Sequence, residues 1–370
     1  MTNPASPLIH TYYLILLDVA VGVCFLVILK VGMVWGMAKL AHVLRDDDPA
    51  AKSATPTVHK KVIPHMPPMA RALWYGLSIA WMLSALIQIN PQFLSRPHPS
   101  AGITGSFVPH VSHASTWFAN SFAQHPMSWN VLSVMVQFSV GALLWTGRGR
   151  GWGRFVAWTG AFVSLFVWVT NGFGGTFHAN LGFLGGWPGP GLLMAFSLVL
   201  LALPNLDEPR MAAFTRIGLV SFWLLAAVEE ALPSNGLWTP TGMRQAFQTN
   251  SAFAEPRFVT SAIDSVAGAF IAHPVVWNAI VVATLLLFAI LTILRRPILI
   301  TRVVASAFLI FTWWVSQNLG LNISFALSID TAPIVALFVW MPHALKRPTK
   351  EKRHQRSAST EDLHGNRASV

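Results

Sequence analysis

Nine long runs of apolar residues follow one another along this chain, and they constrain its fold more than any other feature. They cover 13–40, 72–89, 129–145, 155–170, 192–203, 217–228, 275–294, 303–315 and 332–341. Most are long enough to cross roughly 30 Å of hydrocarbon as helices, while the last is short and depends on its neighbours. A spanning helix satisfies its backbone hydrogen bonds internally. The runs therefore predict an all-α, polytopic membrane protein with about nine transmembrane helices.

The composition argues for the same class. Of the 370 residues, 54% are hydrophobic and 11% are charged, against about 25% charged residues in a typical soluble domain. This balance argues against a soluble multidomain enzyme, a disordered protein and a nucleic-acid binder, in spite of a net charge of +11. The only cysteine, Cys24, lies inside an apolar run, so no disulfide can form within the chain.

The basic residues predict an orientation in the membrane. Lys and Arg gather in alternate connectors, at 45–71, 148–154, 210–216 and 295–302, and again after 345. Only Arg96, Arg244 and Arg257 fall in the other connectors. Because basic loops stay in the cytoplasm, this pattern predicts a cytoplasmic-membrane protein with its N-terminus outside and its C-terminus inside. The first run is too long for a signal peptide and lacks a preceding basic residue, so we expect it to be a retained helix.

An internal duplication is the strongest pattern in the chain. The motif His-Pro-x-x-Trp-Asn begins at His125 and again at His273, and Gln88 aligns with Glu230 in the helix before each motif. Polar residues after the next helix also align. The predicted organisation is an N-terminal helix with a cytoplasmic linker (1–69), two copies of a four-helix unit (70–204 and 213–345), and a basic disordered cytoplasmic tail (346–370). An even number of helices per copy predicts a parallel pseudo-twofold axis rather than an inverted repeat.

The first copy resembles a family of uncharacterised bacterial, mainly actinobacterial, integral membrane proteins. The residues that match its motifs are Leu83, Gln88, Pro91, His125, Pro126, Asn130, Gly172, Gly174, Gly175, Pro188, Gly189, Leu192 and Leu193. The sequence departs from the family pattern at Ser84 and Ala85, where the pattern has Asp-Gly, and at Asn171, where it has Glu. The resemblance implies membership of the family and supplies no activity, and the departures put any role of those acids in doubt here.

Polar residues kept at matching places in the two copies are candidates for a ligand site. Gln88 and Glu230 end equivalent helices, and Asn171 aligns with Gln317, which Asn318 follows. One interpretation is a cavity between the copies in which these side chains contact a small molecule, a proton or an ion. Such a cavity would explain why polar residues occur at these helix ends in both copies. Ordinary solvation of helix ends and a tight glycine-rich turn between helices explain it equally well, and both alternatives stay open.

Histidines offer a second kind of site. His110 and His113 could bind one metal ion together with His178 or His125, and His125 and His273 could ligate haem if the two copies meet at the axis. On the inner side, the segment from Pro64 to Met69 carries imidazole and thioether groups that suit copper. The alternatives are helix-start anchoring for the two His-Pro histidines and a plain linker for the inner segment. The sequence does not identify a cofactor.

Three function classes follow from these patterns. The first is a membrane protein that binds or passes a small molecule or ion between its two copies. The second is a redox-associated membrane subunit that carries haem or copper, and the third is a scaffold or assembly factor. The expected partner in every case is the lipid bilayer, without nucleic acid. The sequence contains no phosphate loop, dinucleotide fingerprint, catalytic triad order or zinc-protease helix, so nothing in it supports an enzyme.

Overall fold

The computed structural model describes residues 14–15, 66, 68–90, 116–117, 120–148, 150–170, 182–203, 208–248, 257–294, 299–317 and 330–341. Within these ranges the secondary structure is entirely helical. The first predicted span, 13–40, lies outside the described residues except for its second and third positions. The predicted linker and the basic tail also lie outside them.

The first half of the described chain forms three long helices and one shorter helix. They are α3 (Pro68–Gln88), α5 (Pro126–Gly147), α6 (Gly151–Thr170) and α7 (Pro190–Ala202), with a short 3-10 turn, η4 (Phe183–Gly185), before α7. α3 packs along α5 and α6 packs along α7. Small residues allow this close approach, since a Cβ atom at Gly191 would lie 2.7 Å from the backbone oxygen of Ser164.

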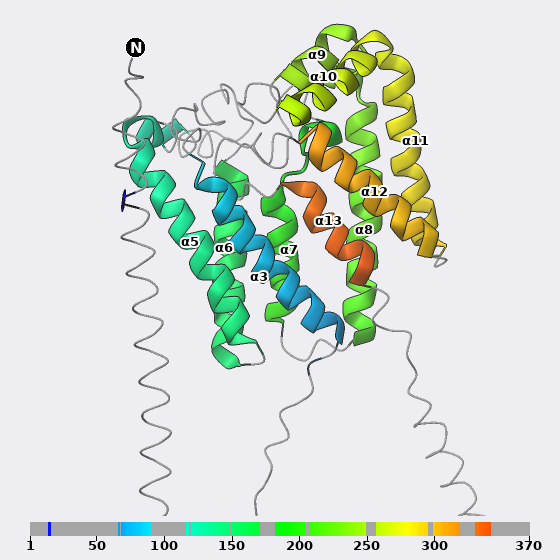
Figure 1. Ribbon diagram of the computed structural model, residues 1–370. Coiled ribbons are helices and arrows are strands. Elements are labelled where there is room, and N and C mark those ends of the chain that lie inside the picture. The colour runs from blue at the N-terminus through cyan, green and yellow to red at the C-terminus, as the bar shows by residue number, and fades with distance from the viewer. Residues whose placement is uncertain are drawn as a thin grey trace, which may run out of the picture.

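The second half of the described chain contains four longer helices and several shorter ones. It contains α8 (Glu208–Ala231), η5 (Pro233–Asn235), α9 (Pro240–Gln248), α10 (Arg257–Ala272), α11 (Pro274–Ile293), α12 (Leu299–Val315) and α13 (Thr331–Trp340). α8 packs along α11, and α12 packs along α13. The two halves meet in the middle of the molecule, where α3 contacts α8 and α7 contacts α13 (Figure 1).

Five of these helices are long and apolar enough to cross a membrane, namely α3, α5, α6, α8 and α11. The remaining predicted spans within the described ranges form the shorter apolar helices α7, α12 and α13. The chain is thus helical as expected, with five candidate spans where the sequence predicted about nine. α9 and α10 were not predicted. They fall in a connector whose residues lack a long apolar run.

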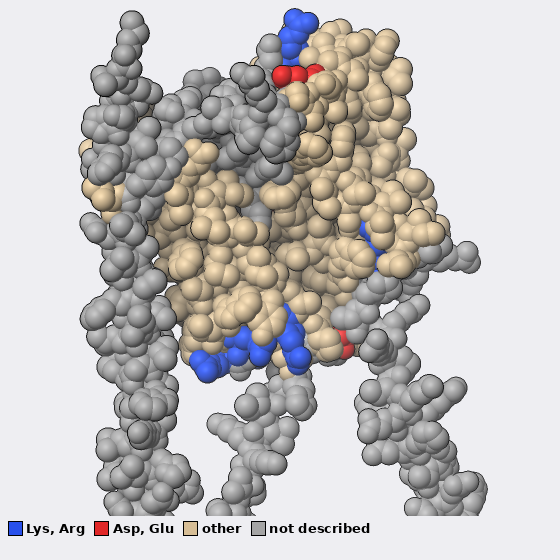
Figure 2. Space-filling view, in the orientation of Figure 1, with Lys and Arg blue, Asp and Glu red and all other residues tan. Residues whose placement is uncertain are grey.

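The surface of the described helices is much more apolar than that of a soluble protein. Large apolar side chains point outward from the helices, with Phe155 72%, Phe162 70% and Ile300 70% exposed. Figure 2 shows a face with few charged atoms on its sides, with several Lys and Arg side chains along the lower end and further basic atoms at the top and at one place on the right. Monomeric soluble proteins rarely expose contiguous apolar patches of this kind. These helices are therefore suited to a lipid bilayer.

The interior combines large aromatic side chains with small and polar ones. Trp81 and Trp223 are fully buried at equivalent places on α3 and α8, and Phe183 of η4 packs edge-on against Trp223 with its ring centroid 6.5 Å away. One buried apolar cluster runs through both halves. Uncharged polar residues, Arg302 and two carboxylic acids are buried as well. A subset of these polar groups forms the candidate site.

Candidate functional site

The same hydrogen bond ends α3 and α8. The side-chain amide of Asn130 on α5 donates to the backbone oxygen of Gln88 at 3.1 Å, and the amide of Asn278 on α11 donates to the backbone oxygen of Glu230 at 3.1 Å. All four residues are fully buried. The last carbonyls of a helix have no partner within the helix. Each Asn therefore satisfies a carbonyl that the apolar interior would otherwise leave unpaired.

The two side chains at these helix ends then differ in chemistry. The amide nitrogen of Gln88 donates to Asn130 Oδ1 at 2.5 Å, so the first pair is closed by two hydrogen bonds. A Glu stands in the place of this Gln in the second pair, and an ionised carboxyl accepts hydrogen bonds but donates none. Accordingly, Glu230 Oε1 and Asn278 Oδ1 are both buried without a hydrogen-bond partner.

The other oxygen of Glu230 faces the η4 turn. Glu230 Oε2 accepts a hydrogen bond from the backbone N–H of Leu184 at 3.4 Å. A Cβ atom at Gly182 would meet the same oxygen, so a larger residue there would require the Glu230 carboxylate to move. The turn thus approaches α8 through its backbone, and glycine permits that approach.

Polar groups from α12 and α13 surround the same turn on its other side. Gln317, just after α12, donates to the backbone oxygen of Phe183 and accepts from the backbone N–H of Ala332, both at 3.4 Å. The hydroxyl of Thr331 donates to the backbone oxygen of Gly186 at 2.5 Å. Both Gln317 and Thr331 are fully buried. These bonds join the start of α13 to the turn that precedes α7.

A second buried carboxyl completes the arrangement. Asp330 caps α13 through Oδ1, which accepts from the backbone N–H of Thr331 at 2.6 Å, while Oδ2 is buried without a partner. Asp330 has a φ of 67°, and Gly186 opposite it has a φ of 94°. A Cβ atom at Gly186 would lie 2.8 Å from Asp330 Oδ1. We call Glu230, Gln317, Asp330 and Thr331 the η4 cluster.

The η4 cluster can bind a species that supplies a proton or a positive charge. Glu230 and Asp330 each have one oxygen held by a backbone N–H and one oxygen without a hydrogen-bond donor. An isolated ionised carboxylate is costly in an apolar interior unless it is protonated, paired with a cation or bound to a metal. The neighbouring backbone and amide oxygens add further acceptors.

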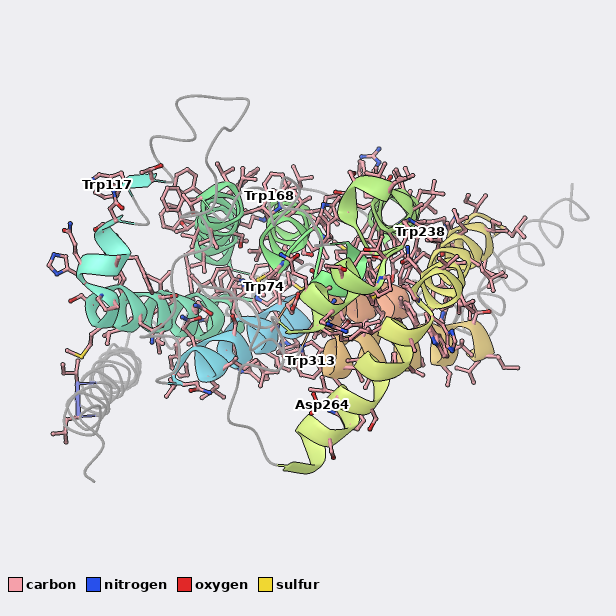
Figure 3. All side chains as sticks on the ribbon, turned by 90° about the horizontal axis from the view of Figure 1, so that it is seen from above. Trp74, Trp117, Trp168, Trp238, Asp264 and Trp313 are labelled. Carbon is pink, nitrogen blue, oxygen red and sulfur yellow. The ribbon has the colours of Figure 1, made fainter. Side chains whose placement is uncertain are left out.

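The structure brings some of the predicted residues together and separates others. Glu230 and Gln317 meet around η4, whereas Gln88 pairs with Asn130 on the α3–α5 side of the molecule. Asn171 and Asn318 lie outside the described residues. Trp168 and Trp238, labelled in Figure 3, donate to the backbone oxygens of Pro188 and Ala231, which lie in the segments that lead into α7 and out of α8.

Three functional residues were missed by sequence reasoning. Asp330 is the one acid in a long stretch without other charges, and it precedes an apolar helix as an N-cap, so both signals were present in the sequence. Asn130 and Asn278 end the repeated motif and are the polar residues in otherwise apolar helix starts. The buried groups of that motif are its asparagines, not its histidines.

The described histidines lie on the surface. His125 and His273 precede α5 and α11 with nearly equal backbone angles, φ −132° and ψ 53° for one and φ −135° and ψ 61° for the other. Both side chains are exposed, and neither makes a capping hydrogen bond. His110, His113 and His178 lie outside the described residues. No group of three potential metal ligands occurs in the part of the chain that the structure describes.

No model of a protein family, no curated protein and no solved structure matches the chain.

Proposed function

We propose that this chain is a cytoplasmic-membrane protein built from two copies of a four-helix unit, with about nine spans, its N-terminus outside and its C-terminus inside. Paired geometry supports the duplication. The bond from Asn130 to the end of α3 recurs from Asn278 to the end of α8 at the same length. The backbone angles before α5 and α11 agree within a few degrees. We also propose that the chain belongs to the family of uncharacterised bacterial integral membrane proteins that its first copy resembles.

We further propose that the protein binds, and passes, a small cation or proton at the η4 cluster, between the two copies. The observation that carries this function is the pair of buried carboxyls, Glu230 and Asp330, each with an unpaired oxygen. Ionisable residues inside a membrane commonly mark ion pathways and proton relays. Discontinuous helices whose starts meet near the centre also accompany such sites in transporters.

The difference between the copies identifies the chemical centre of the site. Gln88 carries its own donor and closes its pair with Asn130 without an added proton or cation. Glu230 lacks that donor, and its pair with Asn278 is completed only when a proton or cation arrives. The first copy is then a fixed scaffold, and the second copy is the binding half.

The test compares Glu230→Gln with Glu229→Gln in purified full-length protein. Thermal unfolding is measured in one detergent across pH values and with added sodium or potassium chloride. We expect the wild-type midpoint to rise with protons or one of these cations, because each stabilises the buried carboxyl. We expect Glu230→Gln to lose that response, because its amide supplies the donor that Gln88 supplies in the other copy. Glu229 is the partly exposed neighbour, so its substitution controls for loss of one charge.

Flux provides the second readout. In proteoliposomes with an enclosed pH-sensitive dye and a potassium gradient, the wild-type protein is expected to move protons or potassium, and Glu230→Gln is expected not to. The proposal is wrong if Glu230→Gln responds as the wild type does in both assays, or if neither protons, sodium nor potassium changes the wild-type midpoint.

A further inference from the structure

An apolar cavity lies in the second half of the molecule, and one of its lining residues, Phe308, stacks on Phe183 of η4 with a ring-centroid distance of 5.7 Å. Its volume is about 480 Å³, and it is partly open to the outside. The lining residues come from α10, α11 and α12, and they include Ala269, Phe270, Trp277, Thr284, Phe308 and Phe311. This volume falls within the range of about 300–1,000 Å³ that is typical of sites for small ligands.

The lining offers an occupant no free hydrogen bond from its hydroxyl groups. Ser265 donates to the backbone oxygen of Ser261 at 2.7 Å, and Thr284 donates to that of Ile280 at 2.7 Å. Both hydroxyls are thus engaged within their own helices. Aromatic rings form one wall, where Phe270 stacks on Trp277 with a centroid distance of 5.0 Å and an interplanar angle of 13°. Such a surface favours an apolar, flexible ligand over a polar one.

The cavity exists because the helices of the second half diverge. α5 and α6 pack closely in the first half, whereas α11 and α12 make few contacts with one another and α10 inserts beside them. In the view from above, α10, which carries Asp264, lies at the edge of the molecule (Figure 3). Among the residues that the structure describes, the wedge between these helices holds the cavity.

The mouth of the cavity opens among residues that face the bilayer. Ile280 is 48% exposed and Phe311 is 39% exposed, and both line the cavity. α11 is the most apolar of the five candidate spans. The molecules present at such a mouth are membrane lipids, and the part of a lipid at this depth is its hydrocarbon chain.

We propose that this cavity is a binding site for one acyl chain of a membrane phospholipid. The chain enters sideways between α10 and α12 and lies against the stacked rings of Phe270 and Trp277. Its burial replaces empty space with apolar contact, which stabilises the divergent arrangement of α10, α11 and α12. The headgroup stays outside the cavity, so the site selects for a hydrocarbon chain rather than for a headgroup.

The test uses full-length protein in lipid nanodiscs that contain a small fraction of phosphatidylcholine with a photoactivatable diazirine in one acyl chain. After illumination, labelled peptides are located by mass spectrometry. We expect labels at cavity residues of α10, α11 and α12 in excess of those at Phe162, a freely lipid-facing residue on α6. Ala269→Trp fills the cavity from α10, and we expect it to remove the cavity labels while the labels at Phe162 remain.

Two further variants make the result decisive. Gly268→Trp is the matched control, because a Cβ atom at Gly268 meets no atom within 4 Å and the residue does not line the cavity. It should leave the cavity labels in place. Thr284→Phe fills the cavity from α11 and should repeat the loss if Ala269→Trp fails to fold. The proposal is overturned if labelling at the cavity equals that at Phe162, or if neither filling variant reduces it, since both outcomes describe ordinary contact with bulk lipid.

Discussion

At the scale of single residues, Asn130 and Asn278 explain how polar helix ends are tolerated inside an apolar core. Each Asn satisfies the backbone oxygen at the end of a neighbouring helix. Asn130 also accepts from the Gln88 amide, while the side-chain oxygen of Asn278 has no donor. The two asparagines therefore contribute unequally to stability, although they occupy matching places in the sequence.

Their substitution by alanine is expected to show this inequality. Asn130→Ala removes the two hydrogen bonds that join it to Gln88, one of them to the buried Gln88 side chain, whereas Asn278→Ala removes one bond to Glu230. Each unsatisfied buried group costs about 1–3 kcal/mol, so Asn130→Ala should lower the free energy of unfolding more than Asn278→Ala. Denaturant unfolding of both variants in the same detergent measures the difference. Equal losses, or a larger loss for Asn278→Ala, would contradict the assignment of these bonds.

At the scale of helices, α7 and α13 are too short to cross a bilayer. With 13 and 10 residues they extend about 20 Å and 15 Å, against about 30 Å of hydrocarbon. Both begin next to the η4 turn, where Thr331 bonds to Gly186. Irregular backbone at membrane depth survives where protein groups satisfy it, and the η4 cluster supplies those groups.

The close packing of α6 on α7 makes a prediction about glycines. A Cβ atom at Gly191 would lie 2.7 Å from the backbone oxygen of Ser164, and one at Gly76 would lie 2.8 Å from the side chain of Leu337. The backbone of Ser164 is part of α6 and cannot move aside, whereas the side chain of Leu337 can change its rotamer. Gly191→Ala should therefore destabilise the protein by about 1–3 kcal/mol through overpacking, and Gly76→Ala should change its stability little. Thermal midpoints of the two variants check this, and a larger loss for Gly76→Ala would argue against it.

Sequence reasoning located the helices better than it located the spans. The apolar runs mark the middle of every candidate span, but α8 begins at Glu208 and continues through Arg210 and Arg216, which lie before the predicted run 217–228. α9 was missed because it is short and carries polar residues. The sequence alignment placed Gln88 opposite Glu230. It did not predict their different partners, because these depend on the chemistry of the side chain, an amide in Gln88 and a carboxyl in Glu230, and on the path of η4 in the folded chain.

At the scale of the whole molecule, the positions of the charged residues relate the fold to a membrane. Arg148 lies at the end of α5 with its guanidinium 4.7 Å from the ring centroid of Tyr75 on α3, and Arg150 follows in the connector to α6. The lower end of the molecule collects such residues, while its sides remain apolar (Figure 2). In this view the molecule thus has a basic lower end and largely apolar sides.

Accessibility to a membrane-impermeant maleimide tests the proposed orientation. In a Cys24→Ser background, Arg150→Cys and Arg210→Cys should react from the cytoplasmic side, because basic connectors are retained there. Thr241→Cys on α9 should react from the opposite side. Spheroplasts and inverted vesicles distinguish the two sides. Reaction of Arg150→Cys and Arg210→Cys from different sides would rule out the proposed topology.

The contrast between Gln88 and Glu230 also has a genetic consequence. Glutamine and glutamate codons differ only in their first base, so a single point mutation converts the carboxyl of the second half into the amide of the first, or the reverse. Forms with two amides or with two acids are each one mutational step away from the present chain. Retention of the acid at position 230 among natural variants of the gene therefore measures selection on the polar site directly.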